Sequence, residues 1–121
     1  MPALVLTADL TSLARVEAAG KSRGCRVESA LNVAALFDKL TEGPADLVIV
    51  DLGMSGLDVR QLLAQLRDLP RPPGTVIAFG PHVHHDKLAA AAQAGADRVL
   101  SRGQFFAQAD DLLRQYADVG A

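Results

Sequence analysis

The stretch that decides the fold is PADLVIVDLGMSGLDV, residues 44–59. Four consecutive apolar residues precede Asp51, a pattern typical of a central parallel strand that is covered on both faces. Gly53 and Gly56 then bound a tight loop. Asp58 is placed to cap a helix, because its carboxylate can accept a hydrogen bond from the first helical turn. The stretch therefore predicts a buried strand, a loop that begins with one carboxylate, and a helix.

The rest of the chain alternates in the same way, with short connections. Strands are predicted over 3–6, 25–29, 46–51, 75–79 and 98–100, and helices over 10–22, 33–40, 59–66, 85–94 and 105–116. Leu10, Leu13 and Val16 are expected on one buried face of the first helix, and Val27 is expected to point inward from the second strand. Five such units imply a doubly wound parallel sheet with helices on both faces.

The composition is that of a globular protein. Half of the 121 residues are apolar and 21% are charged, so a single domain over residues 1–121 is expected, with no output domain. The net charge of −2 gives no basic surface for nucleic acid. No apolar run could span a bilayer and no signal peptide is recognisable, which predicts a soluble, cytoplasmic chain without membrane contact. Cys25 is the single cysteine, so an internal disulfide is excluded.

In a doubly wound sheet, functional groups gather where the strands end. The residues expected at this edge are Asp9, Asp51, Gly80 and Arg102. Two carboxylates and one guanidinium are the only charged groups among them. They define the candidate crevice.

Residues 44–59 resemble the phosphoacceptor segment of bacterial response-regulator receiver domains, which typically reads PDLVLLDLMMPGMDG. The runs TVIAFG (75–80) and AGADRVLSRG (94–103) are similar to the fourth and fifth strands of that family. The resemblance covers essentially the whole chain, in order. It implies a flavodoxin-like, CheY-like (βα)5 fold with three α/β/α layers and strand order 2-1-3-4-5. It also implies a role in two-component signal transduction or a phosphorelay, and no enzymatic activity.

The resemblance assigns the phosphoacceptor position to Asp51 and a metal-facing carbonyl to Gly53. The two acids that normally hold Mg²⁺ beside the phosphoacceptor fall on Thr7 and Ala8. Asp9 is one place too late. Mg²⁺ is usually held by one or two carboxylates together with phosphate, so an ion held only by Asp9, Asp51 and Gly53 is expected to bind weakly. No cofactor is otherwise expected.

The residues that transmit phosphorylation in the family are also changed. The hydroxyl position falls on Gly80, the aromatic switch position on Val99, and the position after the lysine on Gly103 in place of proline. The lysine itself falls on Arg102, which keeps the charge but not the compact ammonium. The fold is therefore expected to be that of a receiver, and the switch to be dismantled.

Structural roles compete with these functional ones. Asp51 is interpreted first as a strand-end carboxylate that accepts hydrogen bonds from loop amides and pairs with Arg102, which would lower its pKa. Asp9 is interpreted as the N-cap or a first-turn acid of the first helix.

Three histidines, His82, His84 and His85, lie within four positions. Imidazoles are natural metal ligands. Adjacent histidines at a helix entrance cannot all face one ion, however, so a surface loop, a partner contact or a pH-sensitive contact is favoured. Cys25 is expected to be a buried, inert thiol.

Three functions remain open. The first is a stand-alone, receiver-like signalling module that acts by protein contact, independently of phosphorylation. The second is a true phosphoacceptor, phosphorylated on Asp51 by a histidine kinase or phosphorelay partner. The third is a small-ligand binder in the crevice. The expected partners are a kinase, a downstream regulator or a second copy of the chain. Receivers commonly associate through their fourth helix, fifth strand and fifth helix, so the resemblance implies this face.

Overall fold

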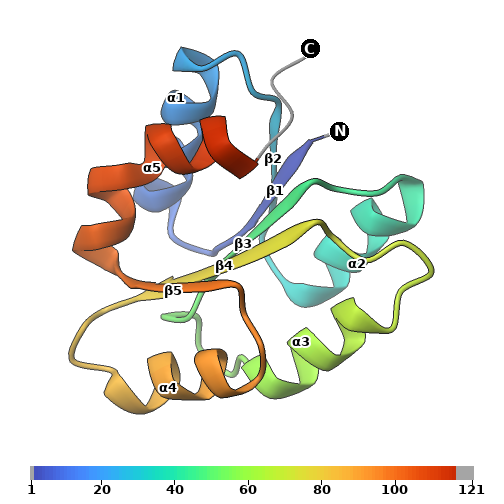
Figure 1. Cartoon of the computed structure of the whole chain (residues 1–121), viewed down its shortest axis with the longest axis vertical. Helices are drawn as coiled ribbons and strands as arrows, with labels where there is room; N and C mark the ends of the chain where they lie inside the picture. Colours follow the sequence, from blue (N-terminus) through green and yellow to red (C-terminus); the bar gives the residue numbers. More distant parts are fainter. Residues whose placement is uncertain (1, 117–121) are drawn as a thin grey trace.

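The computed structural model describes residues 2–116 and shows five parallel strands in one sheet, in the order β2-β1-β3-β4-β5. Strands and helices alternate along the chain (Figure 1). Their bounds are β1 Ala3–Leu6, α1 Leu10–Ser22, β2 Val27–Ala30, α2 Val33–Glu42, β3 Leu47–Asp51, α3 Val59–Arg67, β4 Thr75–Gly80, α4 His85–Gln93, β5 Arg98–Ser101 and α5 Arg102–Tyr116. The predicted flavodoxin-like fold and strand order are confirmed.

The sheet forms the middle of three layers. Helices α1 and α5 cover one face, and α2, α3 and α4 cover the other (Figure 1). Every residue of β3 is buried, because this strand lies at the centre of the sheet and is covered on both sides. The uninterrupted apolar run before Asp51 is therefore explained by the central position of β3 in the sheet.

Two apolar cores result from this arrangement. One contains Leu36, Val48 and Leu62, beneath α2, α3 and α4. The other contains Phe79 and Phe105, whose rings stack with centroids 4.5 Å apart, beneath α1 and α5. Each core removes apolar surface from water, which is the main stabilising contribution to folding.

Side-chain caps fix the starts of three helices. Asp9, Asn32 and Asp58 each accept a backbone hydrogen bond at the start of α1, α2 and α3. These bonds satisfy donors that have no partner inside a helix. The predicted caps Asn32 and Asp58 are confirmed, and so is the N-cap interpretation of Asp9.

Two predictions about the first two units are wrong. Leu10 is 70% exposed, because it lies six residues before the buried Val16 and so about 120° away from it around α1. The second strand begins at Val27, since β1 begins at Ala3 and the two strands pair from these residues. Val27 is half-buried and packs against the core beneath α1 and α5, so its predicted inward orientation is confirmed. Ala30 is the fully buried residue of β2. Within residues 2–116, no helix combines the length and the apolar character that crossing a membrane requires.

Candidate functional site

The candidate site lies where β1 and β3 end side by side. Leu6 pairs with Val50 in the sheet, so Thr7 and Asp51 follow at neighbouring places. The strand order reverses at this point, since β1 leads to β2 on one side and β3 leads to β4 on the other. Doubly wound sheets carry their functional crevice at such a reversal.

Asp51 is held by neutral donors at the bottom of the crevice. The Thr7 hydroxyl donates to its Oδ2 over 2.7 Å, and the Gly53 N–H donates to its Oδ1 over 2.8 Å. Asp51 is 5% exposed and Thr7 is fully buried. We call Thr7, Asp51 and Gly53 the crevice floor. Both carboxylate oxygens of Asp51 are hydrogen-bonded within this floor.

Gly53 permits this arrangement because it has no side chain. A Cβ atom at this position would lie 3.1 Å from Oδ1 of Asp51, closer than most real Cβ contacts. The predicted loop amide is therefore confirmed as a partner of Asp51.

Asp9 lies at the mouth of the same crevice and is held by different groups. Its Oδ1 accepts from the Thr11 N–H over 3.2 Å, and its Oδ2 accepts from the Ser12 hydroxyl over 2.7 Å. Arg102 Nη2 also donates to Oδ2, over 2.8 Å. The Ser12 hydrogen bond and then the Arg102 hydrogen bond hold the pKa of Asp9 below its usual value of 3.8. We call Asp9, Ser12 and Arg102 the crevice rim.

The predicted pairing of Arg102 with Asp51 is wrong. Arg102 is the first residue of α5, and its Nη2 also donates to Ser12 Oγ over 2.6 Å. Two reciprocal hydrogen bonds between Ser101 and Gln104 set the first residue of α5. The Ser101 N–H donates to Gln104 Oε1, and the Gln104 N–H donates to Ser101 Oγ. This capping box starts α5 at Arg102, whose side chain extends to α1.

Sequence reasoning missed Ser12 as part of the rim. Ser12 is fully buried and connects Asp9 to Arg102. Two sequence signals were present. Ser12 follows Asp9 by three residues, the spacing of a reciprocal helix cap, and Ser101 and Gln104 have the S-x-x-Q spacing of a capping box.

Gly80 and Val99 are the residues to which the resemblance assigns the hydroxyl position and the aromatic switch position. A Cβ atom at Gly80 would lie 3.1 Å from Cβ of Leu52, so the loop after β3 packs directly against this glycine. Val99 is half-buried and packs against the core beneath α2, α3 and α4. Neither side chain offers a polar group to the crevice.

The residues of the crevice do not fit a magnesium site. Its carboxylates are Asp51, whose two oxygens accept hydrogen bonds, and Asp9, which is paired with Arg102. Between residues 2 and 116 there is no group of three or more histidine, cysteine, aspartate or glutamate side chains that could hold a metal ion. Mg²⁺ is usually held by one or two carboxylates together with phosphate and water, and here both carboxylates are already bound to other groups of the protein.

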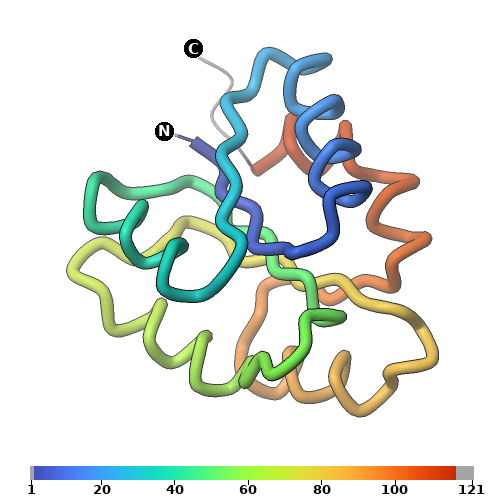
Figure 2. Tube along the Cα trace, turned by 180° about the vertical axis from the view of Figure 1, so that it is seen from behind, coloured from blue at the N-terminus to red at the C-terminus, as the bar shows by residue number. Residues whose placement is uncertain are grey.

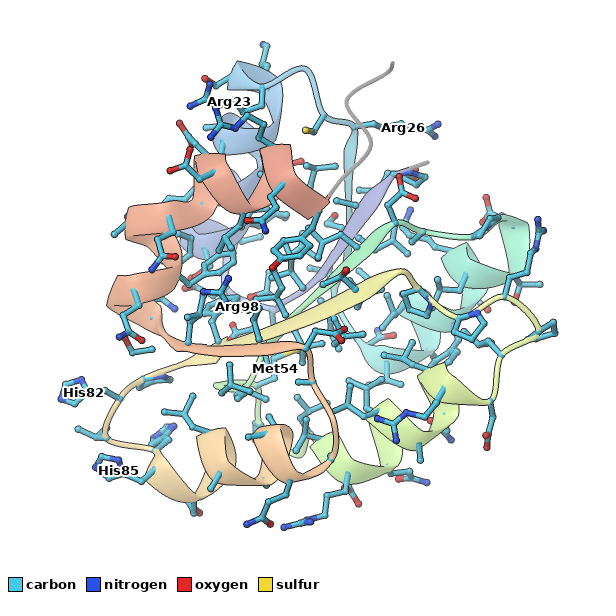
Figure 3. The ribbon with its side chains drawn as sticks, in the orientation of Figure 1. Arg23, Arg26, Met54, His82, His85 and Arg98 are labelled. Atoms are coloured by element: carbon cyan, nitrogen blue, oxygen red, sulfur yellow. The ribbon has the colours of Figure 1, made fainter. Side chains whose placement is uncertain are left out.

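The other candidate residues lie away from the crevice floor. The side chains of His82 and His85 point outward from the loop before α4 and the start of α4 (Figure 3). His84 is the backbone N-cap of α4 but makes no side-chain capping bond, and its Nδ1 is buried without a hydrogen-bond partner among the described residues. Cys25 is buried as predicted, with its Sγ 3.7 Å from the Leu113 carbonyl oxygen.

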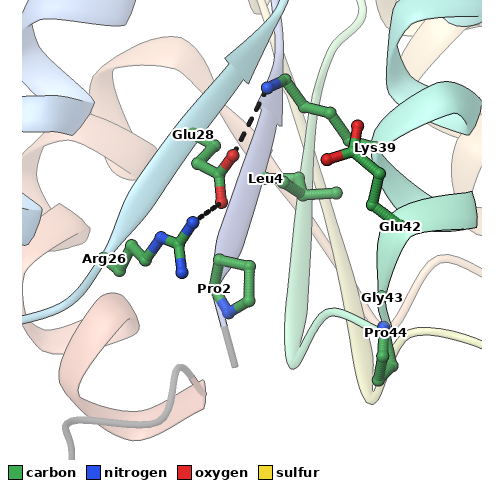
Figure 4. Close-up of a pocket in the computed structure, with 8 residues that line it drawn as sticks. All are labelled: Pro2, Leu4, Arg26, Glu28, Lys39, Glu42, Gly43 and Pro44. Atoms are coloured by element: carbon green, nitrogen blue, oxygen red, sulfur yellow. Dashed lines mark hydrogen bonds and ion pairs between the residues drawn. The ribbon is translucent and has the colours of Figure 1, made fainter.

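A separate cavity of about 210 Å³ lies at the opposite, amino-terminal edge of the sheet (Figure 4). Glu28 lies between two cations there, 3.0 Å from Arg26 and 3.4 Å from Lys39. Glu42 also lines the cavity, so two carboxylates balance the two cations and no net charge is left to select a charged ligand.

Comparison with known proteins agrees with this geometry. The family model described as "Response regulator receiver domain" matches residues 5–113. A response regulator from Thermotoga maritima has a TM-score of 0.77 at 20% identity, with 100% of this chain and 99% of that chain covered. The chemotaxis response regulator CheY4 of Vibrio cholerae has a TM-score of 0.80 at 15% identity, with 95% and 97% covered.

A third solved structure is the solution structure of the beryllofluoride-activated NtrC4 receiver domain dimer. It has a TM-score of 0.74 at 17% identity, with 96% of this chain and 98% of that chain covered. A search of curated protein sequences finds no match. The family model spans most of the chain, and the strand order agrees with that of the family. The chain therefore belongs to the response regulator receiver domains, the signalling modules of two-component systems.

Proposed function

We propose that this receiver domain transmits its signal through protein contact and without phosphorylation of Asp51. The observation that carries the proposal is the crevice floor, in which a carboxylate only 5% exposed accepts from the Thr7 hydroxyl and the Gly53 amide. In a phosphoacceptor receiver, acidic side chains that bind a metal ion would lie beside this carboxylate.

The chemistry of phosphoryl transfer explains why this arrangement matters. The attacking carboxylate oxygen must approach an anionic phosphoryl group, and a divalent cation normally offsets the charge that gathers there. Thr7 and Ala8 provide no carboxylate for that cation. Attack by Oδ2 of Asp51 would also break a buried hydrogen bond to a charged group, the stronger class of hydrogen bond.

The parts of the site that would report phosphorylation are altered as well. Gly80 has no hydroxyl to follow a phosphoryl group, and Val99 has no ring to change rotamer. Arg102 is engaged at the crevice rim by Asp9 and Ser12. A phosphoryl group on Asp51 would have to compete with Asp9 for this guanidinium.

Intact-mass spectrometry after incubation with acetyl phosphate and Mg²⁺ tests the proposal. We expect no phosphoryl adduct on the wild-type chain, while a conventional receiver domain in the same reaction becomes phosphorylated. A single adduct on the wild type that is absent from Asp51→Asn would overturn the proposal and establish a phosphoacceptor.

The partner remains a protein in this proposal: a kinase, a downstream regulator or a second copy of the chain. The beryllofluoride-activated NtrC4 receiver domain is a dimer, so association of receiver domains has a precedent in a similar fold. The face formed by α4, β5 and α5 stays a prediction for this chain, as does a location in the cytoplasm.

A further inference from the structure

A second cavity at the amino-terminal edge, with a volume of about 170 Å³, lies between the end of α3, the start of β4 and the loop that joins α4 to β5. Helices α3 and α4 lie side by side in both views of the molecule (Figures 1 and 2). Three buried aliphatic side chains line the cavity: Leu63, Leu66 and Val76. Pro72 and Pro73 add further apolar surface. The cavity therefore offers apolar surface that a ligand can remove from water.

Two charged side chains line the same cavity, and backbone groups hold both of them in place. Nη2 of Arg67 donates to the Ala94 carbonyl oxygen over 2.8 Å. Oδ2 of Asp97 accepts from the Val76 N–H over 2.7 Å. Within residues 2–116, neither side chain makes an ion pair. The guanidinium has further N–H donors and the carboxylate has a second oxygen, so both can bind a ligand without losing these hydrogen bonds.

Gly95 allows the guanidinium to reach this position. A Cβ atom at residue 95 would overlap Nη2 of Arg67, so any larger residue would displace the guanidinium. The φ angle of Gly95 is +100°, which other residues rarely adopt. The loop between α4 and β5 therefore places one cation and one anion, Arg67 and Asp97, beside one apolar surface.

We infer that this cavity binds a small zwitterion with an aliphatic side chain, that is, an aliphatic α-amino acid. The carboxylate of the ligand pairs with Arg67, because the planar guanidinium matches the geometry of a carboxylate. The ammonium group donates to the second oxygen of Asp97. The aliphatic side chain packs on the buried leucines and on Val76. Each part of such a ligand thus contacts a group of matching chemistry.

Charge and size favour this class of ligand over others. An anion is repelled by Asp97 and a cation is repelled by Arg67, so a ligand that carries both signs is attracted at both positions. A cavity of about 150 Å³ holds a molecule the size of benzene. The volume here therefore suits an aliphatic side chain and excludes a nucleotide, and no aromatic ring on which a base could stack belongs to the described lining.

This inference does not depend on the state of Asp51. The cavity and the crevice floor lie at opposite edges of the sheet. The test of the cavity involves no phosphorylation, so its failure and that of the proposed function are distinguishable.

Titration of the full chain with L-leucine, followed by two-dimensional NMR, tests the inference. We expect saturable shifts at the amides of Arg67, Val76 and Asp97, with a dissociation constant below about 1 mM. Two analogues each lack one charge: 4-methylpentanoate has no ammonium group, and isopentylamine has no carboxylate. Both should bind at least about tenfold more weakly than leucine, and so should glycine, which has no aliphatic side chain.

Two substitutions in the cavity remove one charge each. Asp97→Asn keeps an oxygen that can accept from the Val76 N–H, and Arg67→Met keeps most of the aliphatic chain. Each should raise the dissociation constant for leucine at least about tenfold, because one end of the zwitterion is then left without its partner.

Matched controls make the same changes on α3 and just after it, outside the described lining of the cavity. Arg60→Met also removes a hydrogen bond from α3 to α4, and Asp68→Asn changes the residue next to Arg67. Both controls should leave the dissociation constant within about threefold of the wild-type value.

Circular dichroism identifies any variant that fails to fold. If Arg67→Met does so, Arg67→Lys takes its place, since it keeps the charge without the planar fork and should bind leucine more weakly than the wild type. A dissociation constant for leucine above about 1 mM overturns the inference. So do equal affinities for leucine and its two singly charged analogues, or variants at Arg67 and Asp97 that bind leucine as the wild type does.

Discussion

Asp51 and Asp9 lie at the same edge of the sheet, yet the crevice floor and the crevice rim hold them by different means. Asp51 is 5% exposed and accepts from a hydroxyl and an amide, both neutral. The side chain of Asp9 is 42% exposed and is bound by a guanidinium as well as a hydroxyl. One carboxylate is stabilised by buried dipoles, the other by a charge close to water.

The comparison shows which residues bind the one cation of the site. In a site that binds phosphate and metal, positive charge is gathered around the central carboxylate. Here the cation of the crevice, Arg102, is held by Asp9 and Ser12 at the rim. Asp51 therefore makes no ion pair among the described residues, and Arg102 connects α5 to α1 at the rim.

The largest expected effect comes from breaking the floor. Thr7→Val removes the hydroxyl that donates to Asp51 and leaves a buried carboxylate oxygen without that donor. We expect the free energy of unfolding to fall by about 1–3 kcal/mol, measured by urea denaturation. Thr7→Ser keeps the hydroxyl and should cost less. In an Asp51→Asn background the cost of Thr7→Val should shrink, since no charge is then left unsatisfied. Equal costs in both backgrounds would show that the hydrogen bond does not hold the charge.

A smaller effect is expected at the buried hydroxyl of the rim. Ser12 donates to Asp9 and accepts from Arg102, so Ser12→Ala removes both bonds. The free energy of unfolding should fall by about 1 kcal/mol. Thr11→Ala is the matched control because Thr11 is exposed in the same helical turn and has a comparable gain in helix propensity. If both substitutions have the same effect, the Ser12 bridge does not stabilise the rim.

The floor was largely predictable from sequence, because it depends on local order along one strand. Four apolar residues followed by Asp51 indicate a central strand, and a glycine two positions later permits a close amide. The strand order then brings the residue after β1 to the same place. What sequence reasoning did not predict was that Thr7 would donate to Asp51, since Thr7 was considered only as a missing acid.

The rim was harder to predict, because its partners lie 90 or more positions apart. Both carboxylates were within conceivable reach of Arg102, and periodicity does not distinguish them. The choice follows from the start of α5, which the Ser101–Gln104 cap sets at Arg102. Leu10 was misplaced for a related reason. Leu10 lies three residues before Leu13, a spacing typical of one helix face. It lies about 120° around α1 from the buried Val16, however, and so it is exposed to water.

The effect of salt on the free energy of unfolding should also differ between the floor and the rim. Arg102→Met keeps most of the aliphatic chain and removes the ion pair with Asp9, whose partners are 36% and 42% exposed. We expect a loss of stability smaller than that of Ser12→Ala, and a loss that declines as sodium chloride screens the wild-type pair. The cost of Thr7→Val should not change with salt, because the hydrogen bond from Thr7 to Asp51 is buried. Urea denaturation at low and high salt measures both. A loss from Arg102→Met that is insensitive to salt would mean that packing on Phe106, whose ring centroid lies 5.3 Å from the guanidinium carbon, is what Arg102 contributes, and not charge.

The smallest effect, and the one that isolates charge at the rim, is the pH dependence of Asp9. The folded chain holds the pKa of Asp9 below 3.8, through the hydrogen bonds from Ser12 and Arg102, so the ionised form stabilises the fold. This contribution is complete above the unfolded pKa and is lost as the pH falls through the lower, folded pKa. Asp9→Asn keeps a good N-cap and removes the titration. We expect the stability difference between wild type and Asp9→Asn to be constant near neutral pH and to shrink below about pH 4. A difference that stays constant down to the acid limit would mean that Asp9 acts through its capping hydrogen bond alone, and that the rim, like the floor, is held without charge.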